Sequence, residues 1–168
     1  MSDNHHQHDR STVGVAIVTV SSSRSLETDP SGDAIATGFE SAGHEIAIRE
    51  LLSDDYDRIQ SIVERLSDRD DVDVVITTGG TGVTADDVTP EAVRALFDKE
   101  LPGFGELFRQ LSYEEVGTRA IGSRAIGGVT NETVVFCLPG SENAVRLAVE
   151  ELLLPEVGHL VGLTARPE

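Results

Sequence analysis

The chain has 168 residues, 39% of them hydrophobic, which suffices for one domain with a buried core. Thirty acidic residues face thirteen basic ones, and the net charge of −17 disfavours nucleic acid and anionic membranes as partners. One cysteine, Cys137, excludes an intrachain disulfide. Because no signal peptide and no apolar run of membrane-spanning length is visible, a cytoplasmic protein is expected.

Residues 1–12 are polar and rich in histidine, and they predict a disordered tail before a single domain over 13–168. His5, His6 and His8 could hold a metal weakly, although a solvated tail is the favoured interpretation.

The hydrophobic pattern of the domain predicts strands that alternate with helices. Strands are expected at 13–20, 44–51, 72–77 and 133–138, and helices at 33–42, 53–69, from Pro90, at 105–111 and at 142–154. Ser53 or Asp54 is expected to cap the second helix, and Thr89 the third.

Three stretches are harder to assign. Pro102, Gly103 and Phe104 are expected to interrupt the helical pattern, and residues 112–118 fit no pattern. Residues 119–129, rich in alanine and glycine, indicate a short helix or an irregular loop near the site, and 155–168 are expected to pack back on the domain.

This alternation predicts a three-layer α/β/α sandwich with a mostly parallel central sheet. The strands that end near Val20, Thr77 and Leu138 each lead into a loop of Ser, Thr and Gly. If these strands are parallel, the three loops lie on one edge of the sheet, and together they indicate a polar pocket for a phosphorylated ligand.

The loop from Gly79 to Gly82 is the strongest candidate for contact with that ligand. Glycine lets a ligand approach the backbone, and successive amides can cradle an anion. The loop is neither a G-x-G-x-x-G dinucleotide motif nor a P-loop, and the only lysine, Lys99, is far along the chain. The loop alone is equally compatible with a tight turn that binds nothing.

Two pairs of acids follow strand ends: Asp54 and Asp55, then Asp86 and Asp87. Carboxylates from two such junctions could hold Mg²⁺ together with substrate phosphates. In so acidic a chain they could equally be solvated surface charges. No His/Cys cluster has zinc spacing and no G-x-S-x-G motif is present, so phosphate chemistry is favoured over a serine or cysteine nucleophile.

Several motifs follow one another along the chain, namely Thr77-Thr78-Gly79-Gly80-Thr81-Gly82, Asp87-Val88-Thr89-Pro90-Glu91, Pro102-Gly103-Phe104 with Glu106 and Arg109, Ser123-Arg124-Ala125, and Leu138-Pro139-Gly140-Ser141. In this order they resemble the MoaB/MogA family of molybdenum cofactor biosynthesis proteins. The resemblance covers residues 11–155, and 117–120 and 138–141 look closer to the MoaB branch than to the MogA branch.

The resemblance implies a molybdopterin-binding, MogA-like fold that assembles as trimers or hexamers. It also implies transfer of AMP from Mg-ATP to the terminal phosphate of molybdopterin, before a downstream protein inserts molybdenum or tungsten. Asp87 matches the family's essential acid after the glycine loop. Asp54 matches the other, with Asp55 as the alternative register, and Ser123 matches the serine before Arg-Ala.

We therefore expect Asp54 and Asp87 to hold Mg²⁺ and orient the ligands. Further substrate contacts are expected from the glycine loop, from the later turn, and from scattered polar residues: Thr78, Gly79, Gly80, Thr81, Gly82, Pro139, Gly140, Ser141, Asn143, Ser22, Arg24, Ser31, Arg119 and Ser123. A non-catalytic molybdopterin carrier of the same fold, and an unrelated nucleotide- or phosphosugar-binding domain, are the alternatives.

The acidic residues are scattered along the chain and do not form a tail. Their mutual repulsion would be screened in concentrated salt, so we predict a halophilic source.

Overall fold

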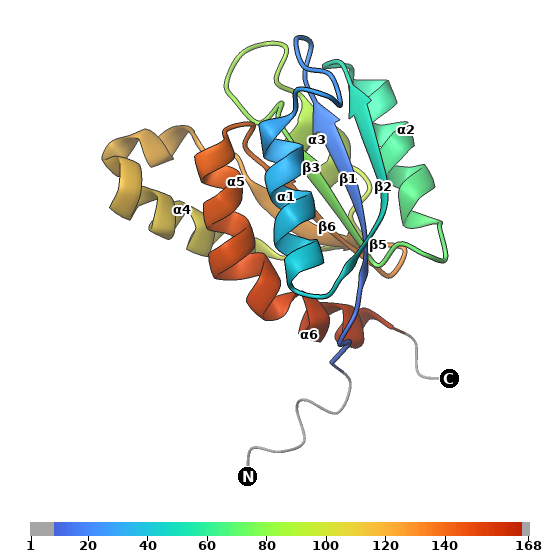
Figure 1. Ribbon diagram of the computed structural model, residues 1–168. Coiled ribbons are helices and arrows are strands. Elements are labelled where there is room, and N and C mark those ends of the chain that lie inside the picture. The colour runs from blue at the N-terminus through green and yellow to red at the C-terminus, as the bar shows by residue number, and fades with distance from the viewer. Residues whose placement is uncertain (1–8, 166–168) are drawn as a thin grey trace.

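A six-stranded sheet in the order β2-β1-β3-β6-β5-β4 forms the centre of the computed structural model, which describes residues 9–165 (Figure 1). The strands are β1 (Gly14–Val20), β2 (Glu45–Leu52), β3 (Val74–Thr78), β4 (Lys99–Glu100), β5 (Ile126–Thr130) and β6 (Thr133–Leu138). The helices are α1 (Pro30–Ser41), α2 (Tyr56–Ser67), α3 (Thr89–Arg94), α4 (Pro102–Val116), η1 (Gly117–Gly122), α5 (Glu142–Ala148), η2 (Val149–Leu153) and α6 (Leu154–Thr164).

The sheet is mostly parallel, as the sequence predicts. β1 pairs in parallel with β2 and β3, and β3 pairs in parallel with β6. β5 runs antiparallel to both β6 and β4. In the centre of the sheet, Ile76 of β3 lies between Ile17 of β1 and Phe136 of β6.

Helices cover both faces of the sheet, which confirms the layered α/β/α prediction. Val15 and Ile17 of β1 pack with the α1, α5 and α6 layer, whereas Ala16 and Val18 pack with the α2 and α3 layer. All four side chains are fully buried. A strand enclosed on both faces favours apolar residues at successive positions, which is why β1 is a nearly continuous apolar run, interrupted by Thr19.

Three helix starts differ from the prediction. α1 begins at Pro30, because the side chain of Asp29 accepts a hydrogen bond from the Gly32 amide and caps it. The N-cap of α2 is Asp55, so the prediction that Ser53 or Asp54 caps this helix was wrong. Val88 occupies the N-cap position of α3 without a side-chain bond, which places Thr89 inside the helix.

The region between α3 and β6 is more regular than predicted. α4 runs through Pro102–Phe104 without interruption, since proline is tolerated in the first turn of a helix. β4 and β5 were not predicted. β5 contains Gly127 and Gly128, which carry no hydrophobic signal, and it joins β6 through a tight turn with Asn131 and Glu132 at positive φ.

The C-terminal segment packs back on the domain as expected, through Val157 and Val161 of α6. α5 passes into α6 through the wide turn η2, which precedes Pro155, a residue that cannot donate a helical hydrogen bond. Of the predicted tail, residues 1–8 lie outside the described part, and the Arg10 amide bonds to the carbonyl of Gly158. No helix within residues 9–165 is long and apolar enough to cross a membrane.

Candidate functional site

The site lies where the direction of the chain across the sheet reverses. β1 is followed by α1 and β2 on one side, and the chain then returns through α2 to β3 on the other side. α1 and α2 cover opposite faces, so a crevice opens beyond the carboxyl ends of β1 and β3. The loops that leave these two strands gather at the upper end of the molecule (Figure 1).

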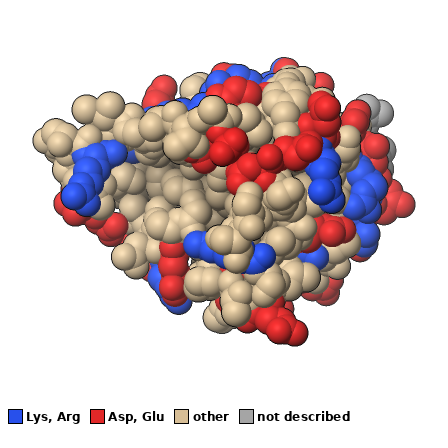
Figure 2. Space-filling model, turned by 90° about the horizontal axis from the view of Figure 1, so that it is seen from above, with Lys and Arg blue, Asp and Glu red and all other residues tan. Residues whose placement is uncertain are grey.

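A hollow of about 460 Å³ occupies this crevice. It is lined by Val20, Ser21, Ser22, Ser23, Arg24, Asp54, Gly79, Gly80, Thr81, Gly82, Asp87 and Gly140. The structure thus brings the three loops predicted from the sequence to one edge of the sheet. Figure 2 looks down on this end of the molecule and shows acidic side chains gathered toward its middle.

Two adjacent glycines shape the central loop. Gly79 and Gly80 have φ of +99° and +70°, a region that favours glycine. A Cβ on Gly79 would overlap the carbonyl oxygen of Val20, so the loop passes directly against the end of β1. The Gly79 amide donates to the carbonyl of Leu138 at 3.0 Å, and a Cβ on Gly140 would lie 3.4 Å from the Cα of Gly79.

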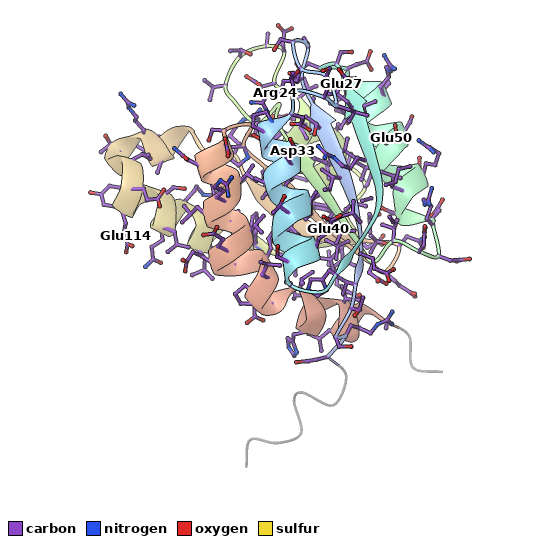
Figure 3. The ribbon with its side chains drawn as sticks, in the orientation of Figure 1. Arg24, Glu27, Asp33, Glu40, Glu50 and Glu114 are labelled. Atoms are coloured by element: carbon purple, nitrogen blue, oxygen red, sulfur yellow. The ribbon has the colours of Figure 1, made fainter. Side chains whose placement is uncertain are left out.

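The first and third loops are tied together at the Gly140 carbonyl. That oxygen accepts from the hydroxyl of Ser31 at 2.7 Å and from the guanidinium of Arg24 at 3.0 Å. Arg24 also lies 3.7 Å from the buried carboxylate of Asp29, which caps α1. In Figure 3 the label of Arg24 stands at the upper end of α1, beside these loops.

Two carboxylates line the hollow, and both are half-buried. Asp54 accepts a hydrogen bond from the hydroxyl of Ser22 at 3.1 Å. Asp87 accepts from the hydroxyl and the amide of Thr84, at 2.7 and 3.0 Å. Chiefly the Thr84 hydroxyl, then the amides of Thr84 and Gly82 and the charge of Arg124, hold the pKa of Asp87 below its usual value against some desolvation. The carboxylate is therefore ionised at neutral pH.

These carboxylates suit Mg²⁺ that arrives with a phosphorylated ligand. Among residues 9–165 no group of three His, Cys, Asp or Glu side chains could hold a metal by itself. Mg²⁺ commonly takes one or two carboxylates and completes its octahedral shell with substrate phosphates and water. Asp54 and Asp87 provide that number of protein ligands at one hollow.

The other predicted contacts are placed around the hollow in different ways. Thr78 is buried and donates to the Pro139 carbonyl at 2.8 Å, and Ser141 caps α5. Asn143, in the first turn of α5, and Arg119, on η1, are exposed and do not line the hollow. The Ser123 hydroxyl oxygen is buried without a hydrogen-bond partner among the described residues.

The sequence reasoning missed Arg124, whose guanidinium bonds to the backbone of the glycine loop. Its position directly after Ser123, in the Ser-Arg-Ala motif, was the available signal.

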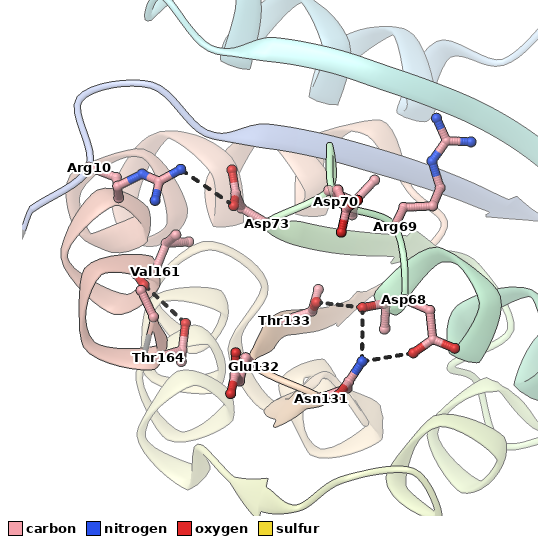
Figure 4. A pocket seen from close by; sticks show the side chains of 13 residues that line it. Arg10, Asp68, Arg69, Asp70, Asp73, Asn131, Glu132, Thr133, Val161 and Thr164 are labelled. Carbon is pink, nitrogen blue, oxygen red and sulfur yellow. Dashed lines mark hydrogen bonds and ion pairs between the residues drawn. The ribbon is translucent and has the colours of Figure 1, made fainter. Parts of the chain in front are cut away.

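A second hollow, of about 470 Å³, lies at the opposite edge of the sheet, near the starts of β3 and β6 (Figure 4). Its polar side chains pair with one another: Arg10 lies 3.8 Å from Asp73, and Asn131 donates to Asp68 at 2.7 Å. It lacks the glycine-rich backbone of the first hollow, so we place the candidate site at the carboxyl ends of the strands.

Comparison with known proteins agrees with this architecture. The probable molybdopterin binding domain family matches residues 16–159. The molybdenum cofactor biosynthesis protein B of Bacillus cereus is 52% identical over 145 residues, which cover 86% of each chain. A crystal structure of a molybdenum cofactor biosynthesis protein B is 50% identical with a TM-score of 0.89, over 91% of this chain and 96% of its own.

A solved structure of MogA is more distant. It is 30% identical, with a TM-score of 0.82, over 90% of this chain and 99% of its own. The closer likeness to MoaB than to MogA confirms the expectation from the sequence motifs. The chain therefore belongs to the family of molybdopterin-binding domains that includes the molybdenum cofactor biosynthesis protein MoaB.

Proposed function

We propose that this protein acts in molybdenum cofactor biosynthesis and transfers AMP from Mg-ATP to the terminal phosphate of molybdopterin at the hollow between β1, β3 and β6. The observation that carries the proposal is the convergence of three strand-end loops and two carboxylates, Asp54 and Asp87, on one hollow. The family membership supplies the class of ligand, a pterin that bears a phosphate.

The backbone of the hollow suits two anionic ligands held side by side. Within the loop Gly79 to Gly82, the amides of Gly80 and Thr81 receive one phosphate, since the Gly79 amide is bonded to the Leu138 carbonyl. The turn Pro139–Ser141 with Asn143 receives another part of the ligands. Ser22 and Arg24 line the hollow, where Arg24 contributes positive charge. Ser31 is buried beside them and accepts a hydrogen bond from Arg24 at 3.2 Å. Ser123 and the exposed Arg119 of η1 are further proposed contacts.

The reaction needs no nucleophile from the protein. An oxygen of the molybdopterin phosphate forms a bond to the α-phosphorus of ATP, the bond from that phosphorus to the bridging oxygen breaks, and pyrophosphate leaves with the electron pair. Two polyanions must be aligned and their charge neutralised, so positioning and electrostatics dominate the barrier. Mg²⁺ would supply the neutralising charge, held by Asp54 and Asp87.

The assembled protein is proposed to be a trimer or hexamer that passes adenylylated molybdopterin to a metal-insertion protein. Apolar side chains exposed on α4 and η1 support self-association: Leu107 is 51% exposed, Tyr113 60% and Ile121 86%. Such side chains are more typical of protein interfaces than of a solvated surface.

The test is transfer of radiolabelled AMP from Mg-ATP to molybdopterin by the wild type and by Asp87→Asn, Asp54→Asn and Asp86→Asn. Asp86 is the matched control, because it is exposed and does not line the hollow. We expect losses of about a hundredfold or more for the first two variants and none for the control.

Two outcomes would change the assignment. If the wild type bound molybdopterin without transferring AMP, the protein would be a carrier of the same fold. Full transfer by Asp87→Asn would show that this carboxylate has no part in the reaction.

A further inference from the structure

The side chain of Arg124 is hydrogen-bonded to both ends of the loop that carries Asp87. The guanidinium of Arg124 donates through Nε to the carbonyls of Gly82 at 2.8 Å and Thr81 at 3.3 Å, and through Nη2 to the carbonyl of Asp87 at 2.8 Å. A further nitrogen is bonded to the carboxylate of Glu91, on α3. These bonds join residues more than thirty positions apart in the sequence.

The bonds of Arg124 determine which way the loop amides point. The C=O and N–H of a trans peptide point in opposite directions. Holding the Thr81 carbonyl therefore turns the Gly82 amide away from Arg124 and toward the carboxylate of Asp87, whose pKa this amide helps to lower. The same side chain thus fixes the peptide that supports the carboxylate and the backbone of Asp87 itself.

The partner of Arg124 outside the loop lies on a helix that packs on the core. Glu91 lies in the first turn of α3, where Ala92 and Val93 are fully buried. The Thr89 amide also donates to the carbonyl of Gly80 at 3.1 Å, which attaches the start of α3 to the glycine loop. A planar guanidinium can meet several acceptors in fixed directions, whereas a lysine ammonium is a single point charge.

We propose that Arg124 is a positioning residue, which holds the loop 81–87 so that the carboxylate of Asp87 and the Gly82 amide keep the geometry that the ligands require. The link to catalysis rests on the proposed AMP transfer, whereas the positioning itself is a property of the free protein. Arg124 has three of its four contacts with the loop backbone and one with Glu91, so it acts through Asp87 and not on the reacting atoms.

The test compares Arg124→Gln and Arg124→Lys with the control Arg65→Gln. Arg65 makes an exposed ion pair with Glu50, 3.3 Å long, and does not line the hollow. Hydrogen exchange of the segment 81–90 is measured in the free protein, without ATP or molybdopterin. We expect exchange about tenfold faster or more in both Arg124 variants, since bonds to a charged donor are lost, and no change in the control.

The second readout is the free energy of unfolding of the same variants, measured with urea. A positioning role predicts that exchange of the segment 81–90 rises by more than the change in global stability accounts for, whereas a residue that only stabilised the fold would speed exchange throughout the core. Arg124→Lys, which keeps the charge while losing the planar fork, should show the same local change. If Arg124→Gln did not fold, Arg124→Lys would still decide the question through hydrogen exchange.

Activity separates this inference from the proposed function. If the wild type transfers AMP, Arg124→Gln is expected to lower kcat by about tenfold or more with a smaller change in KM for ATP. Unchanged exchange of the segment 81–90 in Arg124→Gln would overturn the inference. If the wild type transferred no AMP, the proposed function would fail, while the measurements on the free protein would still decide whether Arg124 positions Asp87.

Discussion

Gly79 shows how closely the backbone of the site is packed. Its φ is +99°, and a Cβ there would overlap the carbonyl oxygen of Val20. We expect Gly79→Ala to lower the free energy of unfolding by about 1–3 kcal/mol or more, because the backbone strain and the overlap act together. Urea unfolding measures the change.

Gly122 is the control for that substitution. A Cβ on Gly122, at the end of η1, would meet no atom within 4 Å. Gly122→Ala is expected to leave the urea midpoint unchanged. An equal loss in both variants would show that the close approach at Gly79 is unimportant.

His44 gives the stability a pH dependence. Its Nδ1 accepts a hydrogen bond from the Val13 amide at 3.2 Å, which requires the neutral ring, and burial holds the pKa of His44 below its ordinary 6.5. The unfolded chain therefore takes up the proton first as the pH falls. The contribution of His44 to the free energy of unfolding is complete above pH 6.5, the ordinary pKa. It is lost as the pH falls below that value toward the lower pKa of the folded protein.

Urea unfolding at several pH values checks this prediction. The wild type should lose more stability than His44→Gln as the pH falls from about 7.5 through the ordinary titration range of histidine. Parallel pH profiles for the two proteins would contradict the assigned role of His44.

At the scale of elements, burial decided what the sequence could reveal. β1, β3 and β6 are enclosed on both faces, so their apolar runs identified them. β5 was not predicted, because Gly127 and Gly128 add no hydrophobic side chains to the pattern of the sequence. In the fold, both glycines lie against aromatic rings. The two exposed residues of β4 carry no pattern at all.

The position of the site could likewise be predicted from the sequence, but some of its contacts could not. Loops that follow parallel strands must share one edge, which placed Gly80 and Gly140 correctly. The contacts of Arg124 could not be predicted, because they depend on carbonyls of a loop about forty residues earlier whose direction only the fold determines.

Substitutions of Asp54 and Asp55, near the start of α2, are expected to differ: one affects ligand binding and the other affects stability. The side chain of Asp55 caps the helix by accepting from the Arg58 amide at 2.9 Å, while Asp54 lines the hollow. Asp55→Ala is expected to lower the free energy of unfolding by about 1 kcal/mol and to leave ligand binding intact. Asp54→Asn should weaken ligand binding and leave the free energy of unfolding nearly unchanged.

The measurements are urea unfolding and titration with molybdopterin and Mg-ATP. If Asp55→Ala abolished binding while Asp54→Asn did not, the alternative register of the sequence motif would be the right one, and Asp55 would be the functional acid.

At the scale of the whole molecule, the charge of −17 is spread over every part of the fold. Figure 3 shows Glu27 by the upper loops, Glu40 near the lower end of α1, Glu50 on β2 and Glu114 on the projecting α4. Like charges distributed in this way oppose the compact state.

We therefore expect the free energy of unfolding to rise with KCl concentration at neutral pH, because salt shortens the range of this repulsion. Urea unfolding in about 0.05 to 2 M KCl measures the effect, and sucrose, which raises stability without screening charge, is the control. A stability that does not change with salt would argue against the predicted halophilic source.

The central claim is that one hollow, between the ends of β1, β3 and β6, holds a pterin phosphate and a nucleotide together. The most direct test is a structure of the protein crystallised with Mg²⁺, ATP and molybdopterin. We expect phosphate oxygens within hydrogen-bond distance of the amides of Gly80 and Thr81, and Mg²⁺ bound by Asp54 or Asp87. Both ligands bound instead at the opposite edge, in the hollow around Asp73, would contradict the claim.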